Sequence, residues 1–215
     1  KVGVGATLNG TTQYFSRADN ASLSITGDLS IEAWIYFNSL APLYTTIVAK
    51  WEVSGNNKSY NFFVKNTGEL VFATSLDGAN QLERTSTNAF LTTGKWYHVA
   101  VVYNSTAGTA TFYKNGYALT DNGVALHTSI LYGTATLGIG AQDFDSGGPD
   151  WPLNGSIRNV AIFNDQRIAA EILIDATNPM ADNSGNANNV SQWLMTDAST
   201  VTALDDLNAN ANDLS

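Results

Sequence analysis

The chain has 215 residues and no cysteine, so it is long enough to bury a hydrophobic core but has neither disulfides nor thiolate metal ligands. Charged residues make up only 13% of it, and the net charge is −9, with ten basic residues that form no cluster. This balance argues against a nucleic-acid partner and an anionic membrane surface, and the lack of a long apolar stretch argues against membrane insertion.

Strands are predicted in chain order where apolar and polar residues alternate. Residues 30–37 place isoleucine, alanine and phenylalanine on one face and Glu32, Trp34 and Tyr36 on the other. Further strands are predicted at 60–64, 69–74, 96–103, 109–113, 117–119, 135–140 and 156–163. The pair Asn115-Gly116 predicts a tight hairpin, because both residues tolerate positive φ.

One short helix is predicted at 167–173, capped by Asn164 or Asp165. The polar tail at 174–215 contains an apolar segment near 190–196, and we expect it to form a strand that closes the sheet. Many short strands separated by turn residues predict an all-β fold, a two-sheet antiparallel jelly-roll sandwich. We expect residues 1–215 to form one domain with its core at 5–173.

Nine phrases in a fixed order resemble the laminin-G-like domain of the concanavalin A-like lectin/glucanase superfamily. They are LNGTTQY at 8–14, ASL at 21–23, GDLSIEAW at 27–34, IVAKW at 47–51, GKWYHVA at 94–100, FYKNG at 112–116, LGIG at 137–140, LNGSIRNVAIFN at 153–164 and AAEI at 169–172. The resemblance covers most of the chain and implies a jelly roll. It says little about the ligand, because this fold serves several functions.

The glycine-rich loop at 140–152 carries three aspartates, and oxygen ligands at short spacing suit Ca²⁺. It resembles the calcium loop of the pentraxins. The resemblance implies metal ligands at Gln142, Asp143 and Asp145, with Asn56 and Asn57 from an earlier loop. The match is imperfect, since pentraxins have Asp-Asn at the latter pair and a glutamate where this chain has alanine. A solvated acidic loop without a metal is the alternative interpretation.

A second candidate cation site combines Asp19 and Asp28 with carbonyl groups of the turn at 9–10. Related domains hold a structural Ca²⁺ in this region. Arg158, however, stands where many relatives carry an aspartate, and it would repel a cation or pair with Asp28.

Sugar rings stack their C–H faces on aromatic side chains, so the five tryptophans are relevant to glycan binding. Trp34 and Trp96 lie inside predicted strands and are expected in the core, and Trp193 is expected to anchor the closing strand. The candidate ligand-binding residues are Trp51, Trp151 and the acidic residue before it, Asp150. The alternative is that both tryptophans cover sheet ends.

Catalysis is not expected from this sequence. Glucanases of this fold group their carboxylates along one strand as Glu-x-Asp-x-x-Glu or Glu-x-Asp-x-Glu, and every glutamate of this chain is isolated. The serine-hydrolase motif Gly-x-Ser-x-Gly is also missing from the sequence.

The sequence therefore predicts a non-catalytic binding module. The first hypothesis is a lectin-like module that binds carbohydrate, with Ca²⁺ as a candidate assisting ion. The alternative is a structural or adhesive module that contacts protein in a cell-surface or virion assembly. The uncharged, hydrogen-bonding composition favours an extracellular, cell-surface or virion-surface location. The partner would be a glycan or a surface protein, and a larger multidomain chain or assembly is one context we consider.

Overall fold

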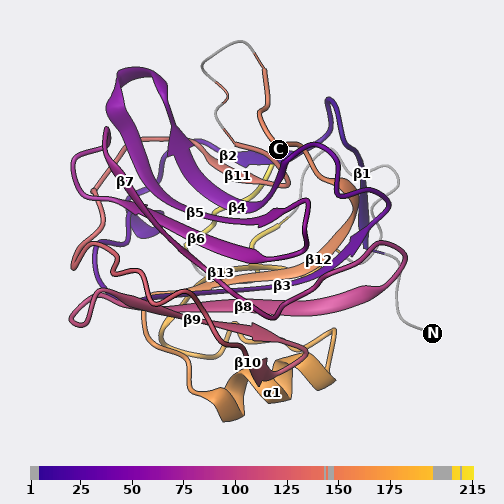
Figure 1. Ribbon diagram of the computed structural model, residues 1–215. Coiled ribbons are helices and arrows are strands. Elements are labelled where there is room, and N and C mark those ends of the chain that lie inside the picture. The colour runs from indigo at the N-terminus through magenta and orange to yellow at the C-terminus, as the bar shows by residue number, and fades with distance from the viewer. Residues whose placement is uncertain (1–4, 143, 145–147, 196–204, 209) are drawn as a thin grey trace.

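Two antiparallel sheets face each other in the computed structural model, which describes residues 5–142, 144, 148–195, 205–208 and 210–215 (Figure 1). The seven-stranded sheet has the order β1 (Ala6–Asn9), β12 (Asn154–Phe163), β3 (Leu29–Phe37), β8 (Trp96–Asn104), β9 (Thr109–Lys114) and β10 (Tyr117–Ala118), with β13 (Asn189–Trp193) beside β12. The six-stranded sheet has the order β2 (Phe15–Arg17), β11 (Leu137–Ile139), β4 (Tyr44–Glu52), β5 (Asn57–Lys65), β6 (Leu70–Ser75) and β7 (Gln81–Thr85).

The hydrophobic core lies between the sheets because alternate residues of each strand point to one face. On β3, Ile31 and Ile35 are fully buried in this core, as the alternation predicted. The opposite face of β3 carries Glu32, Trp34 and Tyr36, and it is the outer face of the seven-stranded sheet. Most strands predicted from alternation are found, while β11 is shorter than predicted at Leu137–Ile139.

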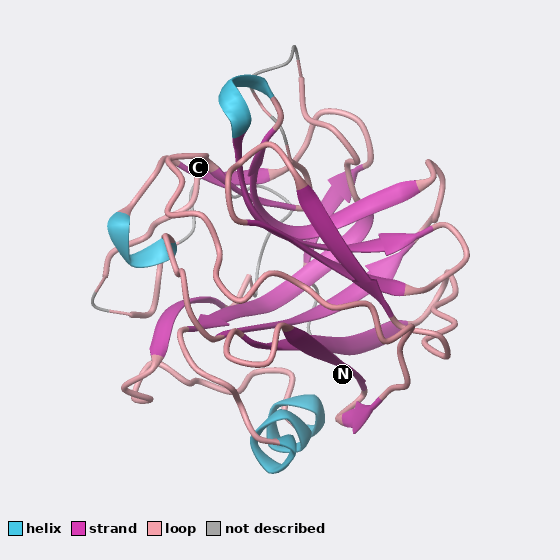
Figure 2. Cartoon of the chain, turned by 60° about the vertical axis from the view of Figure 1, so that its left-hand side comes forward, coloured by secondary structure: helices cyan, strands magenta, loops and turns pink. Residues whose placement is uncertain are grey.

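The helix α1 (Ala169–Thr177) covers part of the outer face of the seven-stranded sheet, where Ile172 packs against Ala100, Val102 and Tyr113 (Figures 1 and 2). The expected capping by Asn164 or Asp165 is wrong, because the helix starts later than predicted. The backbone N–H of Ile168 instead donates to the Glu171 carboxylate at 2.9 Å. Two short 3₁₀ turns, η1 (Ala21–Leu23) and η2 (Ser54–Asn56), complete the helical segments of the described chain.

The tail returns to the sandwich. Strand β13 pairs antiparallel with β12, and Trp193 within it is fully buried, with its indole N–H donating to the carbonyl of Asn212 at 2.9 Å. Near the end of the chain, Ser16 and Ser215 exchange two backbone hydrogen bonds of 2.9 Å. Within the described part of the chain, no helix has the length and hydropathy that a bilayer crossing needs.

The expected fold class is confirmed: the protein is an all-β, two-sheet antiparallel jelly-roll sandwich with one short α-helix. Antiparallel pairing places each strand's end beside its neighbour's start, so the connecting loops gather at the two ends of the sandwich. Those two ends differ in chemistry.

Candidate functional site

One end of the sandwich is formed by four loops at 38–43, 65–69, 86–95 and 140–153. Backbone hydrogen bonds join these loops to one another and to the strand ends beside them. They run from Asn38 to Asn154, from Asn66 to Leu43, from Leu91 to Gly68 and from Gly94 to Phe37, at 2.9–3.0 Å. We call this the aromatic end, defined by Tyr36, Tyr44, Phe90, Trp96 and Trp151. The loop at 53–56 lies at the opposite end, which we call the hairpin end.

Trp151 is the centre of a ring cluster on the outer face of the six-stranded sheet. Its ring centroid lies 4.5 Å from that of Tyr44 and 5.1 Å from that of Phe63, and the latter two are 5.5 Å apart. Trp151 has a φ of 52°, in the left-handed region that bulky residues rarely adopt. The carbonyl of Trp151 accepts a hydrogen bond from the backbone N–H of Thr46 at 2.9 Å. This bond ties the strained residue to β4. The Tyr44 and Trp151 side chains remain half-buried.

The acidic loop is closed at its base by a short bridge. Gln142 and Asp150 exchange backbone hydrogen bonds of 3.1 and 2.8 Å. The buried amide of Gln142 accepts a hydrogen bond from the Asn61 side chain in the middle of β5. Phe144 stacks on Tyr14 with ring centroids 4.7 Å apart. The exposed Asp150 and half-buried Trp151 therefore follow each other on a pinned segment.

Trp51 does not share this exposure, and the expectation of a partly exposed platform is wrong for it. Its side chain is 3% exposed, because it packs in the same buried cluster as Ala49 and Ala73, and the ammonium of Lys58 lies 5.8 Å from its ring centroid. Trp51 also lies near the end of β4, toward the hairpin end, whereas Trp151 contacts the start of that strand.

The residues expected to bind Ca²⁺ are not brought together by the described part of the structure. Asn57 follows η2 at the hairpin end, where its side-chain oxygen accepts from the N–H of Thr134 at 2.9 Å. Gln142 lies beyond the other end of β11, and its side-chain oxygen accepts from Asn61. Asn56 is exposed in the η2 turn.

The amide oxygens of Asn57 and Gln142 lie beyond opposite ends of β11 and each accepts a hydrogen bond, so they do not fit one shared calcium site. Among the residues that the structure describes, no group of three or more histidine or acidic side chains is arranged to hold a metal ion. Asp143 and Asp145 lie outside the described residues, so a calcium ion on the acidic loop stays a prediction.

The second candidate cation site is occupied by protein groups. Asp19 accepts from the buried Lys50 ammonium at 2.6 Å. Burial lowers the pKa of Lys50 from its ordinary value, while Asp19 opposes that effect. Asp28 accepts from Ser105 and Gln166, and these bonds outweigh burial and hold the pKa of Asp28 below its ordinary value.

Arg158 lies away from Asp28, between two aromatic rings. Its guanidinium carbon is 5.3 Å from the Trp34 ring centroid and 4.7 Å from that of Trp96. Both tryptophans are half-buried on the outer face of the seven-stranded sheet, so the expectation of a core position is wrong for them. The alternation of apolar and polar residues at 30–37 already places Trp34 on the face that points away from the core.

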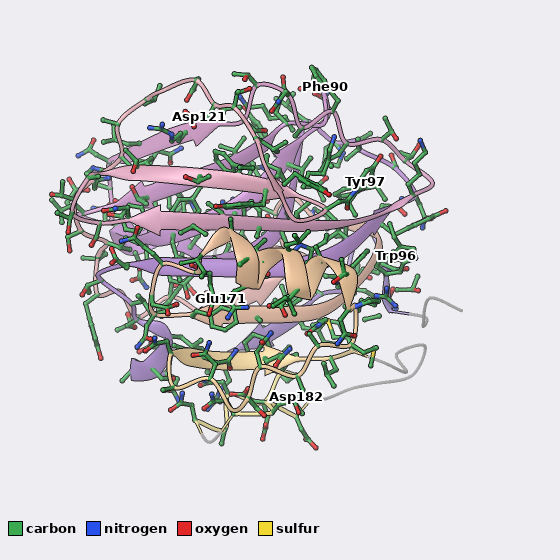
Figure 3. All side chains as sticks on the ribbon, turned by 90° about the horizontal axis from the view of Figure 1, so that it is seen from below. Phe90, Trp96, Tyr97, Asp121, Glu171 and Asp182 are labelled. Atoms are coloured by element: carbon green, nitrogen blue, oxygen red, sulfur yellow. The ribbon has the colours of Figure 1, made fainter. Side chains whose placement is uncertain are left out.

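Sequence reasoning missed Phe90, which lies in the loop at 86–95. Its side chain is 63% exposed, and its φ is 45°. Figure 3 shows Phe90, Tyr97 and Trp96 along the same side of the molecule. The sequence around Phe90 gives no sign that its ring is exposed, since the loop is a short run of small, polar and apolar residues.

The fold defines a β-sandwich of the concanavalin A type. The chain belongs to the concanavalin A-like lectin/glucanases superfamily, whose laminin-G-like family profile matches residues 9–173. This confirms the family expected from the sequence. No curated protein sequence matches the chain closely enough to serve as a relative.

Three solved structures illustrate the fold. A putative carbohydrate-binding protein from Bacteroides ovatus aligns with a TM-score of 0.67 at 15% identity, over 98% of this chain and 57% of that one. A CBM40 domain of the Ruminococcus gnavus IT-sialidase bound to α2,3-sialyllactose gives 0.61 at 14%, over 82% and 96%. A pentraxin from Limulus polyphemus gives 0.56 at 15%, over 81% and 80%. At these identities the likeness concerns the fold alone.

Proposed function

We propose that this protein is a non-catalytic carbohydrate-binding module whose glycan site lies at the aromatic end, around Trp151 and Tyr44. The observation that carries the proposal is the Trp151 ring cluster, in which a strained backbone holds a half-buried indole beside a second half-buried ring. Strain of this kind clusters at binding sites, where the surrounding structure holds the residue in place. Two of the similar folds bear names that refer to carbohydrate.

The chemistry of the site suits a sugar. The faces of Trp151 and Tyr44 offer apolar, polarisable surface for the C–H groups of a pyranose ring. The carboxylate of the exposed Asp150 stands next to the indole in the chain, where it can accept hydrogen bonds from sugar hydroxyls. A few directed polar groups beside an aromatic surface are typical of small-molecule sites.

The absence of catalysis is part of the proposal. The carboxylates of Glu32 and Asp175 both bind Arg167, and all three residues are at most 5% exposed where α1 covers the sheet. A glycosidase needs two carboxylates that flank the sugar bond, and a pair that is covered by a helix and neutralised by an arginine does not reach one.

We further propose that the module acts outside the cell or on a cell or virion surface, as its uncharged, hydrogen-bonding composition favours. Ca²⁺ on the acidic loop is retained as a proposal that rests on Asp143 and Asp145 in the sequence. If the ion assists binding, EDTA will weaken glycan affinity and added Ca²⁺ will restore it.

The proposal is tested by screening the protein on an array of mono- to hexasaccharides that includes sialyllactose, followed by calorimetry. We expect Trp151→Ala to weaken the best glycan by about 2 kcal/mol, roughly 30-fold, because it removes an aromatic anchor. The matched control is Tyr132→Ala, since Tyr132 is 58% exposed and its neighbour Gly133 lies against Asn57 at the hairpin end. Equal affinity of Trp151→Ala and the wild type would refute the site.

A structural or adhesive role is the second candidate function, favoured by one observation. Leu173 and Ile174 of α1 are 38% and 62% exposed, and Leu173 lies against Gly116, the neighbour of Tyr117, which is 70% exposed. Exposed apolar groups that lie close together are typical of protein contacts. Binding of no array glycan, together with self-association that Ile174→Lys abolishes, would favour this role.

A further inference from the structure

Phe90 combines high exposure with backbone strain. Its side chain is 63% exposed, so it contributes little to the core, and its φ of 45° lies in the left-handed region. That conformation costs free energy for a residue with a Cβ, and more so for a bulky one. Glycine or asparagine would adopt it with less strain. Packing therefore does not explain why a phenylalanine stands here.

The segment around Phe90 is fixed, which gives its ring a defined position. The flanking residues Ala89 and Leu91 are buried in the core. The Leu91 N–H donates to the Gly68 carbonyl at 3.0 Å, and the Ala89 carbonyl accepts from the Lys114 ammonium. With both neighbours anchored inward, the Phe90 ring is directed outward from a rigid loop.

Phe90 belongs to the same end as the Trp151 cluster. Leu91, its neighbour, and Leu43 both hydrogen-bond to the turn at 65–68, so these two segments flank one turn. Leu43 is 54% exposed and directly precedes Tyr44, which contacts Trp151. The exposed side chains of Leu43 and Phe90 therefore flank one polar turn, and Leu43 is continuous in the chain with the Trp151 cluster.

The side chains around Leu43 and Phe90 are mostly neutral hydrogen-bonding groups, with the charged Glu69 and Lys95 in the same loops. Exposed hydroxyl and amide groups come from Asn66, Thr67, Asn88 and Thr92. An isolated ring among hydroxyls and amides complements an oligosaccharide, which alternates C–H faces with hydroxyl groups. A lipid surface fits poorly, because a net charge of −9 is repelled by anionic headgroups.

We propose that Phe90, with Leu43, forms a second sugar-contact region of the same binding site, so that the site takes an oligosaccharide and not a single sugar. One sugar stacks at Trp151 and Tyr44, and another unit of the same glycan contacts the Phe90 ring. This inference rests on the proposed function and adds the size of its substrate.

The test separates binding from stability by using Phe90→Asn and Phe90→Gly. Both substitutions remove the ring and relieve the left-handed strain, so we expect an unchanged or higher melting temperature. We expect affinity for the best array oligosaccharide to fall about tenfold, while affinity for the monosaccharide that binds at Trp151 stays unchanged. Leu43→Ala should weaken the oligosaccharide in the same way, and Tyr132→Ala at the hairpin end is the control.

Three outcomes would overturn the inference. A drop in melting temperature with unchanged oligosaccharide affinity would make Phe90 a structural residue. Loss of binding in Trp151→Ala but not in the Phe90 variants would limit the site to one sugar and leave the proposed function intact. A wild-type protein that binds no array glycan would overturn the proposed function as well.

Discussion

Gly68 shows how strongly a single residue position can be determined. It lies in the turn between β5 and β6 with a φ of 87°, which favours glycine. A Cβ built at this position would stand 2.3 Å from the backbone oxygen of Leu91. Because the contact is with backbone, no side-chain rotation can relieve it. Gly68 thus permits the close approach that anchors the loop carrying Phe90.

We predict that Gly68→Ala lowers the free energy of unfolding by at least about 2 kcal/mol, since it adds left-handed strain to a steric clash. Urea denaturation followed by tryptophan fluorescence would measure the loss. Gly185→Ala is the control, because no atom lies within 4 Å of a Cβ there. A Gly68 variant as stable as this control would contradict the close contact.

At the level of elements, α1 is joined to the seven-stranded sheet by a buried cluster of charges. Arg167, just before the helix, binds Glu32 on β3 at 3.1 Å and the Asp175 carboxylate within the helix. His98 on β8 contacts Glu32 at 3.1 Å. Breaking such a buried set by removing one partner is costly, because it leaves a desolvated charge. The cluster therefore fixes where α1 sits on the sheet.

This cluster makes stability depend on pH in a defined direction. Burial raises the pKa of Asp175 above its ordinary value of 3.8, the Glu32 charge adds to this, and Arg167 opposes it. The folded protein then holds this proton more tightly than the unfolded chain. As pH rises from 3.8 through the folded-state pKa, this group lowers the free energy of unfolding.

Asp175→Asn removes the titrating carboxyl group, and with it this loss of stability as pH rises. We predict that the free energy of unfolding of this variant, minus that of the wild type at the same pH, is larger at about pH 7 than at about pH 3.5. Denaturant unfolding at both pH values would measure the difference. Asp182→Asn is the control of opposite sign, because hydrogen bonds from Ser184 lower the pKa of Asp182. In Figure 3, Asp182 lies below the helix and Phe90 above it. If the stability difference changes with pH in the same direction in both variants, the opposite pKa shifts assigned to Asp175 and Asp182 are refuted.

On the scale of the whole molecule, the tail completes the core although it lies beyond the family-matched residues 9–173. Trp193 is among the largest fully buried side chains, and the nearly buried Leu214 belongs to the same core cluster. Stability of the sandwich therefore depends on a segment whose composition is otherwise polar.

We predict that Trp193→Ala lowers the free energy of unfolding by about 3–5 kcal/mol, the usual cost of emptying a large buried aromatic site. Thermal or urea unfolding would measure it. Met180→Ala in the same tail is the control, since Met180 is 42% exposed. Near-wild-type stability of Trp193→Ala would show that the tail is not part of the cooperative core.

The sequence by itself determined the fold class, the family and the faces of the clearest strands, because alternation and Asn-Gly or glycine turns are local signals. It did not predict β4, where polar residues and a register shift between Thr46 and Val48 interrupt the alternation. Gln142 and Asn57 seemed compatible with one site, since sequence order does not reveal that β11 separates them.

Only the tertiary structure decided which aromatic residues reach solvent. Trp51 and Trp151 look alike in the sequence, each beside a polar loop, yet one is buried in a packed cluster and the other is half-buried on a strained turn. Phe90 gave no local signal at all. Exposure depends on which loops meet at one end of the sandwich, and that is set by long-range pairing of strands far apart in the chain.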